Sequence, residues 1–110
     1  MIDRARLQSL RVEVDALDDK LVELVAARQR LVEAVAEVKG RGAPLRDRVR
    51  ERAILDRIRA AARNAGLSPR IAVPVWRRLL DVSVEHERRI LARSEDAAAC
   101  CGCSGSEPEG

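Results

Sequence analysis

Charged residues occupy positions where the hydrophobic pattern of this sequence calls for apolar ones. Arg28 interrupts an apolar series that runs from Leu7 to Val38. Burying a charge is costly unless it is paired, so Arg28 needs either a carboxylate of the protein or an anionic ligand. Lys39 follows eleven residues later, and at about 100° per helical residue it returns to within about 20° of the same face. The two cations therefore share one helix face.

Two pairs of polar residues, each with its members four positions apart, accompany these cations. Asp47 and Glu51 form one pair, and Ser83 and Glu87 form the other. A spacing of four places both members on one face of a helix. Three helical segments thus each present polar residues toward one interior, and this convergence favours a binding site over isolated ion pairs.

Each of these residues also has an ordinary structural interpretation. Arg28 can form a buried salt bridge with Glu51 or Glu87, because ion-pair networks also place charges inside proteins. Asp47 can be a carboxylate at the start of a helix, and Glu87 can be a solvated side chain. Arg11 lies 17 residues before Arg28 and points about 100° away from it. It should serve a different surface, which in a dimer can be the partner's site.

A long helix must position the cations. The apolar residues from Leu7 to Val38 recur at spacings of three and four, which is the pattern of a helix with a continuous seam. Neither Pro nor Gly occurs in this stretch before Gly40, so we expect a helix over 3–39, roughly 55 Å long. A compact monomer of this size has a radius of gyration of only ~13 Å and cannot cover such a seam. The seam therefore predicts an intertwined homodimer.

A second helix follows the breaker at 40–44, a segment with two Gly and one Pro. We expect it to run from Leu45 or Arg46 to Ala65. The residues expected to face inward are Val49, Ile54, Ile58 and Ala61.

A third helix should begin at Ser68 and Pro69, which are typical of an N-cap and a first helical residue. Gly66 ends the helix before it. We expect the third helix to end near Ser94. Pro74, inside its first two turns, should cost a hydrogen bond and kink the helix.

The composition agrees with an all-α chain. Hydrophobic residues make up 46% of the sequence, but Trp76 is its only aromatic residue, so the core must be aliphatic. Charged residues make up 35%, a profile typical of long amphipathic helices. The expected fold is three helices per chain, one of them very long.

Residues 1–94 and residues 95–110 differ in net charge and in cysteine content. Residues 1–94 hold all 21 Lys and Arg but only 14 of the 18 Asp and Glu, a charge of +7, and residues 95–110 carry −4. A basic body favours anionic partners. We expect one domain over 1–94 and a disordered tail over 95–110. The tail holds three thiols that imply neither a disulfide framework nor a metal site: Cys100, Cys101 and Cys103.

No apolar run approaches the ~20 residues that a membrane span requires, and the first residues do not form the apolar core of a leader. We therefore expect a cytoplasmic protein without a membrane partner.

Several motifs resemble the all-α (type II) chorismate mutases. Residues 10–21, LRVEVDALDDKL, are similar to the opening signature of that family, and Arg28 and Lys39 continue it at the family's spacing. PLRD at 44–47, followed by RER at 50–52, resembles a second family motif, and Ser83 with Glu87 matches the pair on its last helix. The resemblance covers roughly residues 7–91, and it is the combination of motifs that makes it specific.

The resemblance implies a cofactor-independent isomerase that converts chorismate to prephenate as a homodimer, in the pathway to aromatic amino acids. It implies that Arg28 and the partner's Arg11 bind the two carboxylates of chorismate, and that Lys39 donates to the ether oxygen. It also implies that Glu51 accepts from the C4 hydroxyl, with Asp47 beside it. Ser83 would help to hold a carboxylate, and Glu87 would be the second donor to the ether oxygen.

That reaction suits such a site, since the rearrangement is intramolecular and needs no nucleophile, base or metal. Catalysis reduces to holding a compact conformer and stabilising a polarised transition state with fixed cations. Some family members have Gln where this chain has Glu87. A glutamate donates only when protonated; burial would raise its pKa, and Arg28 and Lys39 would lower it. We therefore expect activity to fall as pH rises.

Relatives that share the fold are the closest alternatives. Aminodeoxychorismate mutases act on a substrate with an amine at C4, and Asp47 and Glu51 could accept from an amine as readily as from a hydroxyl. Isochorismate-pyruvate lyases use a related site, but their lysine-bearing loop differs from residues 40–44. Feedback control by Phe or Tyr would require a regulatory enzyme partner, since the chain has no room for an effector domain.

Two alternatives belong to other classes. A basic helical dimer could bind nucleic acid through its arginines, but Arg28 lies in an apolar seam and the chain has no aromatic stacking platform. We therefore expect no nucleic-acid partner. A non-catalytic scaffolding dimer would not require the retained set of polar positions.

Overall fold

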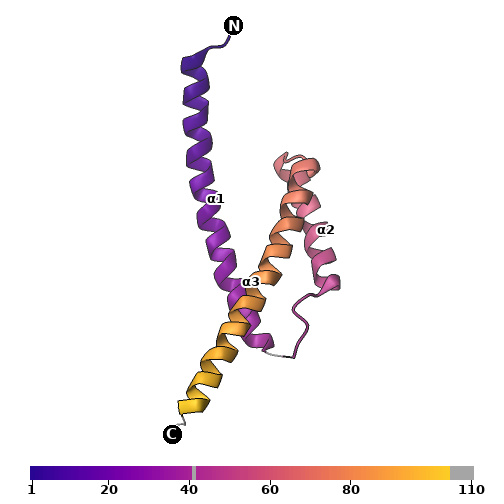
Figure 1. Cartoon of the computed structure of the whole chain (residues 1–110). Helices are drawn as coiled ribbons and strands as arrows, with labels where there is room; N and C mark the ends of the chain where they lie inside the picture. Colours follow the sequence, from indigo (N-terminus) through magenta and orange to yellow (C-terminus); the bar gives the residue numbers. More distant parts are fainter. Residues whose placement is uncertain (41, 105–110) are drawn as a thin grey trace. The chain divides into compact units, whose positions relative to one another are not determined.

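The computed structural model describes residues 1–40 and 42–104, with side chains described up to residue 93. Within these residues the chain forms helices α1 (Arg4–Lys39), α2 (Arg48–Ala65) and α3 (Pro69–Ser104) and no strand (Figure 1). The predicted all-α class and the three helices are therefore confirmed. The chain divides into two units, Met1–Val32 and Glu33–Gly110, and the boundary falls inside α1.

The helix ends follow from capping residues. Asp3 accepts a hydrogen bond from the backbone N–H of Arg6 at 3.0 Å and so caps α1. Gly66 ends α2 in the left-handed conformation, with φ of 75°, which glycine adopts without steric cost. The N–H of Leu67 then donates to the carbonyl of Ala62 at 2.7 Å, which completes a Schellman-type ending.

Helix α3 begins as expected, with Ser68 Oγ accepting from the N–H of Arg70 at 3.2 Å. It continues through Pro74. The end predicted near Ser94 is wrong, because α3 extends to Ser104. Residues 97–99 are three consecutive alanines, and alanine has the highest helix propensity. The rest of the predicted tail, residues 105–110, lies outside the described residues.

The core lies between α2 and α3, which pack side by side (Figure 1). Leu55 and Trp76 are partly buried against this core. All of its buried members are aliphatic side chains or alanines, as the composition requires. Its buried members are Ile54, Ile58 and Ala62 of α2 and Ala72 and Leu80 of α3.

Two residues predicted to face inward on α2 do not. Val49 is 83% exposed, and Ala61 is exposed while Ala62 is 2% exposed. The buried residues Ile54, Ile58 and Ala62 follow one another at steps of four, and a step of four returns to nearly the same face of a helix. Val49 and Ala61 fall outside this series.

Candidate active site

The first turn of α2 is fixed by its own cap. Asp47 has extended backbone, and its Oδ1 accepts from the N–H of Arg50 at 3.0 Å. The interpretation of Asp47 as a helix-start carboxylate is thus confirmed. Glu51 lies in the turn that this cap fixes, so its carboxylate is held near the end of the segment that joins α1 to α2.

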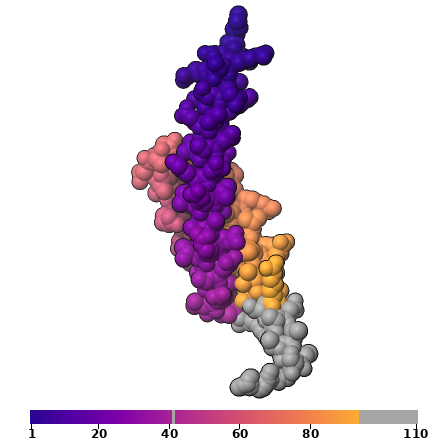
Figure 2. Space-filling view, turned by 90° about the vertical axis from the view of Figure 1, so that its left-hand side faces the viewer, coloured from indigo at the N-terminus to yellow at the C-terminus, as the bar shows by residue number. Residues whose placement is uncertain are grey.

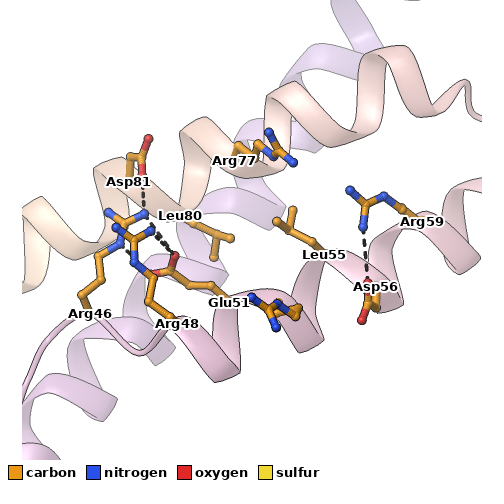
Figure 3. A pocket seen from close by; sticks show the side chains of 10 residues that line it. Arg46, Arg48, Glu51, Leu55, Asp56, Arg59, Arg77, Leu80 and Asp81 are labelled. Atoms are coloured by element: carbon orange, nitrogen blue, oxygen red, sulfur yellow. Dashed lines mark hydrogen bonds and ion pairs between the residues drawn. The ribbon is translucent and has the colours of Figure 1, made fainter.

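Arg46, in the segment that joins α1 to α2, forms an ion pair with Glu51. Arg46 Nε lies 2.9 Å from Glu51 Oε2, and Arg46 Nη2 donates to Glu51 Oε1 at 3.0 Å. The same Nη2 lies 2.6 Å from Asp81 Oδ1 on α3 (Figure 3). Arg48 Nη1 is a further neighbour of Glu51 Oε1 at 3.4 Å. Arg46 therefore joins the first turn of α2 to the middle of α3.

These contacts shift two ionisation equilibria. The hydrogen bond from Arg46 holds the pKa of the Asp81 carboxyl below its usual value, and the positive charges of Arg46, Arg78 and Arg48 act in the same direction. The pKa of Arg46 is raised, chiefly by its hydrogen bond to Asp81 and further by Glu51. Both residues therefore favour the charged form.

The end of α1 is tied to the rest of its unit at two points. His86 Nε2 on α3 lies 2.6 Å from Glu33 Oε2, and Ala36, between Glu33 and Lys39, is completely buried. Lys39 Nζ donates to the carbonyl of Leu45 at 3.4 Å. Lys39 is thereby placed beside the segment that leads into the first turn of α2.

The polar pair on α3 lies on its buried side. Glu87 is 7% exposed, the one buried charged residue among those the structure describes, and Ser83 is half-buried. The interpretation of Glu87 as a solvated side chain is therefore wrong. Ser83 and Glu87 are therefore both turned away from bulk solvent.

Two of the predicted residues lie in the unit Met1–Val32. Arg11 is exposed on α1, and Arg28 is half-buried on the same helix. The other five lie in the unit Glu33–Gly110, where the contacts described above connect their helices. These five are Lys39, Asp47, Glu51, Ser83 and Glu87.

An open groove of about 570 Å³ lies between α2 and α3 on the side of Glu51. Leu55 and Leu80 lie between the two helices, and Arg77 reaches in from α3 (Figure 3). Arg59 pairs with Asp56 at 3.3 Å farther along α2. The groove is predominantly cationic, as its complete lining shows: Arg46, Arg48, Glu51, Arg52, Leu55, Asp56, Arg59, Arg77, Leu80 and Asp81.

Sequence reasoning assigned no role to Arg46, Asp81, Glu33 or His86. Arg46 was visible in the PLRD motif, but its partner Asp81 is 35 residues away in sequence. Glu33 and His86 are 53 residues apart. No local spacing rule reaches across such separations, so no sequence signal could have paired them.

The described part of the chain offers neither a metal site nor a membrane-spanning helix. No group of three or more His, Cys, Asp or Glu residues is placed there to hold a metal ion. None of its helices is long and apolar enough to cross a membrane.

The unit Glu33–Gly110 thus carries an ammonium, a hydroxyl and three carboxylates of the predicted set on an all-α scaffold. The family model for chorismate mutase type II matches residues 10–88, and the chain belongs to this family. The family predicted from the sequence motifs, and with it the isomerase activity of a chorismate mutase, is confirmed.

Three curated relatives match the chain, and the first of them carries the name of the family. The chain is 28% identical over 92 residues to a chorismate mutase of Methanocaldococcus jannaschii, covering 83% of this chain and 93% of that protein. It is 38% and 37% identical over 84 residues to the T-proteins of Haemophilus influenzae and Enterobacter agglomerans. These matches cover 76% of this chain but only 22% of each T-protein. No solved structure matches significantly.

The contact between Arg46 and Asp81 makes the stability pH-dependent. Because the pKa of Asp81 is lower in the folded protein, its stabilisation is complete above the unfolded value of about 3.9 and is lost as pH falls through the lowered value. Asp81→Asn should therefore lower the free energy of unfolding at pH 7, and this difference from the parent protein should close below about pH 4. Urea denaturation from pH 7 to pH 3 measures it.

Asp56→Asn is the matched control, since Asp56 pairs with an arginine in the same groove but is 68% exposed. Its effect at pH 7 should be smaller, as is usual for an exposed ion pair. A stability difference for Asp81→Asn that remains constant down to pH 3 would contradict the role given to Arg46.

Proposed function

We propose that the chain converts chorismate to prephenate in a homodimer, with each site built mostly by one protomer and completed by an arginine of the other. One observation carries the proposal: the family match over 10–88 spans all seven predicted site residues, from Arg11 to Glu87. The chorismate mutase of Methanocaldococcus jannaschii supports it, because the similarity covers nearly the whole of that protein.

The cations of α1 would bind the substrate and stabilise the transition state. Arg28 and the partner's Arg11 hold the two carboxylates of chorismate. Lys39 leaves its 3.4 Å contact with the Leu45 carbonyl and donates to the ether oxygen. Negative charge develops on that oxygen as the C–O bond breaks and the new C–C bond forms, and a fixed ammonium stabilises this charge.

The other two helices would orient the ring. Glu51, held by Arg46 at 2.9 Å, accepts from the C4 hydroxyl, with Asp47 beside it. Ser83 helps to hold a carboxylate, and Glu87 in its protonated form donates to the ether oxygen. Because every step occurs within one molecule, fixing its reactive conformer supplies much of the rate enhancement.

The homodimer would cover the seam of α1. All nine seam residues are 36–88% exposed in the single chain: Leu7, Leu10, Val14, Leu17, Leu21, Leu24, Leu31, Val35 and Val38. The side chains that α1 presents along its length are drawn in indigo to magenta in Figure 2. An aliphatic stripe of this length is costly in water. A second copy offers an identical stripe, as a symmetric dimer requires. We place this dimer in the cytoplasm.

Loss of chorismate absorbance at mildly acidic pH tests the activity. The parent protein should turn chorismate over with saturation, and Arg28→Ala should lower kcat/KM by about 10²–10³-fold, because it removes a cation that binds a substrate carboxylate. Arg30→Ala is the control: Arg30 is exposed on the same helix, and its loss should change kcat/KM by less than about twofold. Folded dimer that leaves chorismate unchanged would refute the proposed reaction.

Mixing two inactive variants tests the shared site. Arg11→Ala and Arg28→Ala homodimers should each be inactive. In a heterodimer, the protomer with Arg11→Ala keeps its own Arg28 and receives the partner's Arg11, so one of the two sites is complete. After random exchange of subunits, half of the dimers are mixed, and about a quarter of the parent activity should return. If no activity returns although mass spectrometry detects heterodimers, Arg11 does not act across the interface.

The buried Glu87 predicts a pH dependence. Only the protonated carboxyl donates a hydrogen bond, so kcat/KM should fall as pH rises from mildly acidic to alkaline and Glu87 ionises. Glu87→Gln keeps a donor at every pH and should remove most of this decline. A parent profile that is flat over this range, or a decline that persists unchanged in Glu87→Gln, would contradict the role of Glu87 as a donor.

A further inference from the structure

Glu51 belongs to a cluster of four charges that sum to zero. The cations are Arg46, at 2.9 and 3.0 Å from Glu51, and Arg48, at 3.4 Å. The second carboxylate is Asp81, at 2.6 Å from Arg46. The wider groove contains five arginines and three carboxylates, so the surroundings of this cluster are positive. Glu51 therefore offers acceptor oxygens without a net negative charge nearby.

The cluster also limits how many donors Glu51 can receive. A carboxylate has about four lone-pair sites. Arg46 Nη2 and Arg48 Nη1 both donate to Oε1, whereas Arg46 Nε lies 2.9 Å from Oε2 without the geometry of a hydrogen bond. The Glu51 side chain is only 13% exposed, so little room is left for water to complete its shell. Oε2 is therefore the oxygen left to accept from a ligand, and a hydroxyl supplies one donor, whereas an ammonium brings three donors and a positive charge.

We propose that Arg46 and Asp81 determine specificity at C4 of the substrate by holding Glu51 in a charge-neutral cluster that accepts a hydroxyl and disfavours an ammonium. This inference rests on the proposed function, in which Glu51 accepts from the C4 group. Arg46 and Asp81 act through Glu51 and are positioning residues. An aliphatic amine is protonated near pH 7, so the analogue of chorismate with an amine at C4 is the compound that this cluster disfavours.

Two variants change the charge of the cluster in opposite directions. Arg46→Gln leaves it at −1 and should favour the amine. Asp81→Asn leaves it at +1 and should disfavour the amine further. The measured quantity is the KM of chorismate divided by the inhibition constant Ki of the amine analogue, both at pH 7. Because both constants come from one variant, a loss of folded protein cancels in this ratio.

The ratio KM/Ki should rise by about five- to tenfold in Arg46→Gln and fall by a similar factor in Asp81→Asn, as expected for a unit charge a few ångströms from the ligand. Arg59→Gln is the matched control. It removes the same charge from the same groove, but eight residues from Glu51, which is about 12 Å along a helix. Screening over that distance should keep its effect below about twofold.

A merely structural role for these residues would weaken both ligands alike in both variants. Ratios that move in the same direction, or that stay within the range of Arg59→Gln, would overturn the inference while the parent protein still turns chorismate over. A parent protein that does not convert chorismate would instead refute the proposed function. If that protein binds neither compound, both proposals fall together.

Discussion

The chain has more apolar helix surface than its own helices can bury, and its architecture depends on this constraint. The fully described residues include seven buried apolar side chains, three of which are alanines: Ala36, Ile54, Ile58, Ala62, Ala72, Leu80 and Val84. Alanine buries little area, but it lets helix backbones approach closely. The long seam of α1 meanwhile remains 36–88% exposed. A core this small is marginal for a chain of 110 residues, and this supports the proposed homodimer.

Polar side-chain contacts fix the helix segments that such a small core does not hold in place. Glu33 and His86 tie the end of α1 to α3, and Arg46 and Asp81 tie the start of α2 to the same helix. Half-exposed pairs of this kind contribute little to stability, but they set position. Helix α3 is thus the common platform, and Glu87, one residue after His86, lies on it.

Local rules predicted the features that depend on local chemistry. The uninterrupted apolar pattern before Gly40 predicted α1. Gly66 predicted the end of α2, and Ser68 predicted the start of α3. The face of α2 was only partly predicted, since the burial of Ala62 instead of Ala61 depends on packing against α3. The candidate site residues were chosen from motifs and stay a prediction. The contact of Arg46 with Asp81 was not predictable, because folding alone brings together residues 35 positions apart.

The neutral cluster resolves a conflict within the proposed site. Chorismate carries two carboxylates, and an ionised Glu51 at about 6 Å from one of them would repel it by roughly 3 kcal/mol at an effective dielectric constant of 20. Such a cost would cancel most of what a charged hydrogen bond contributes. Arg46 and Arg48 beside Glu51, and Asp81 beside Arg46, bring the charge of the cluster to zero, while Oε2 of Glu51 still offers lone pairs to a ligand. In the proposed site, Glu51 could therefore accept from a hydroxyl of a dianion, because the charges of Arg46, Arg48 and Asp81 offset its own.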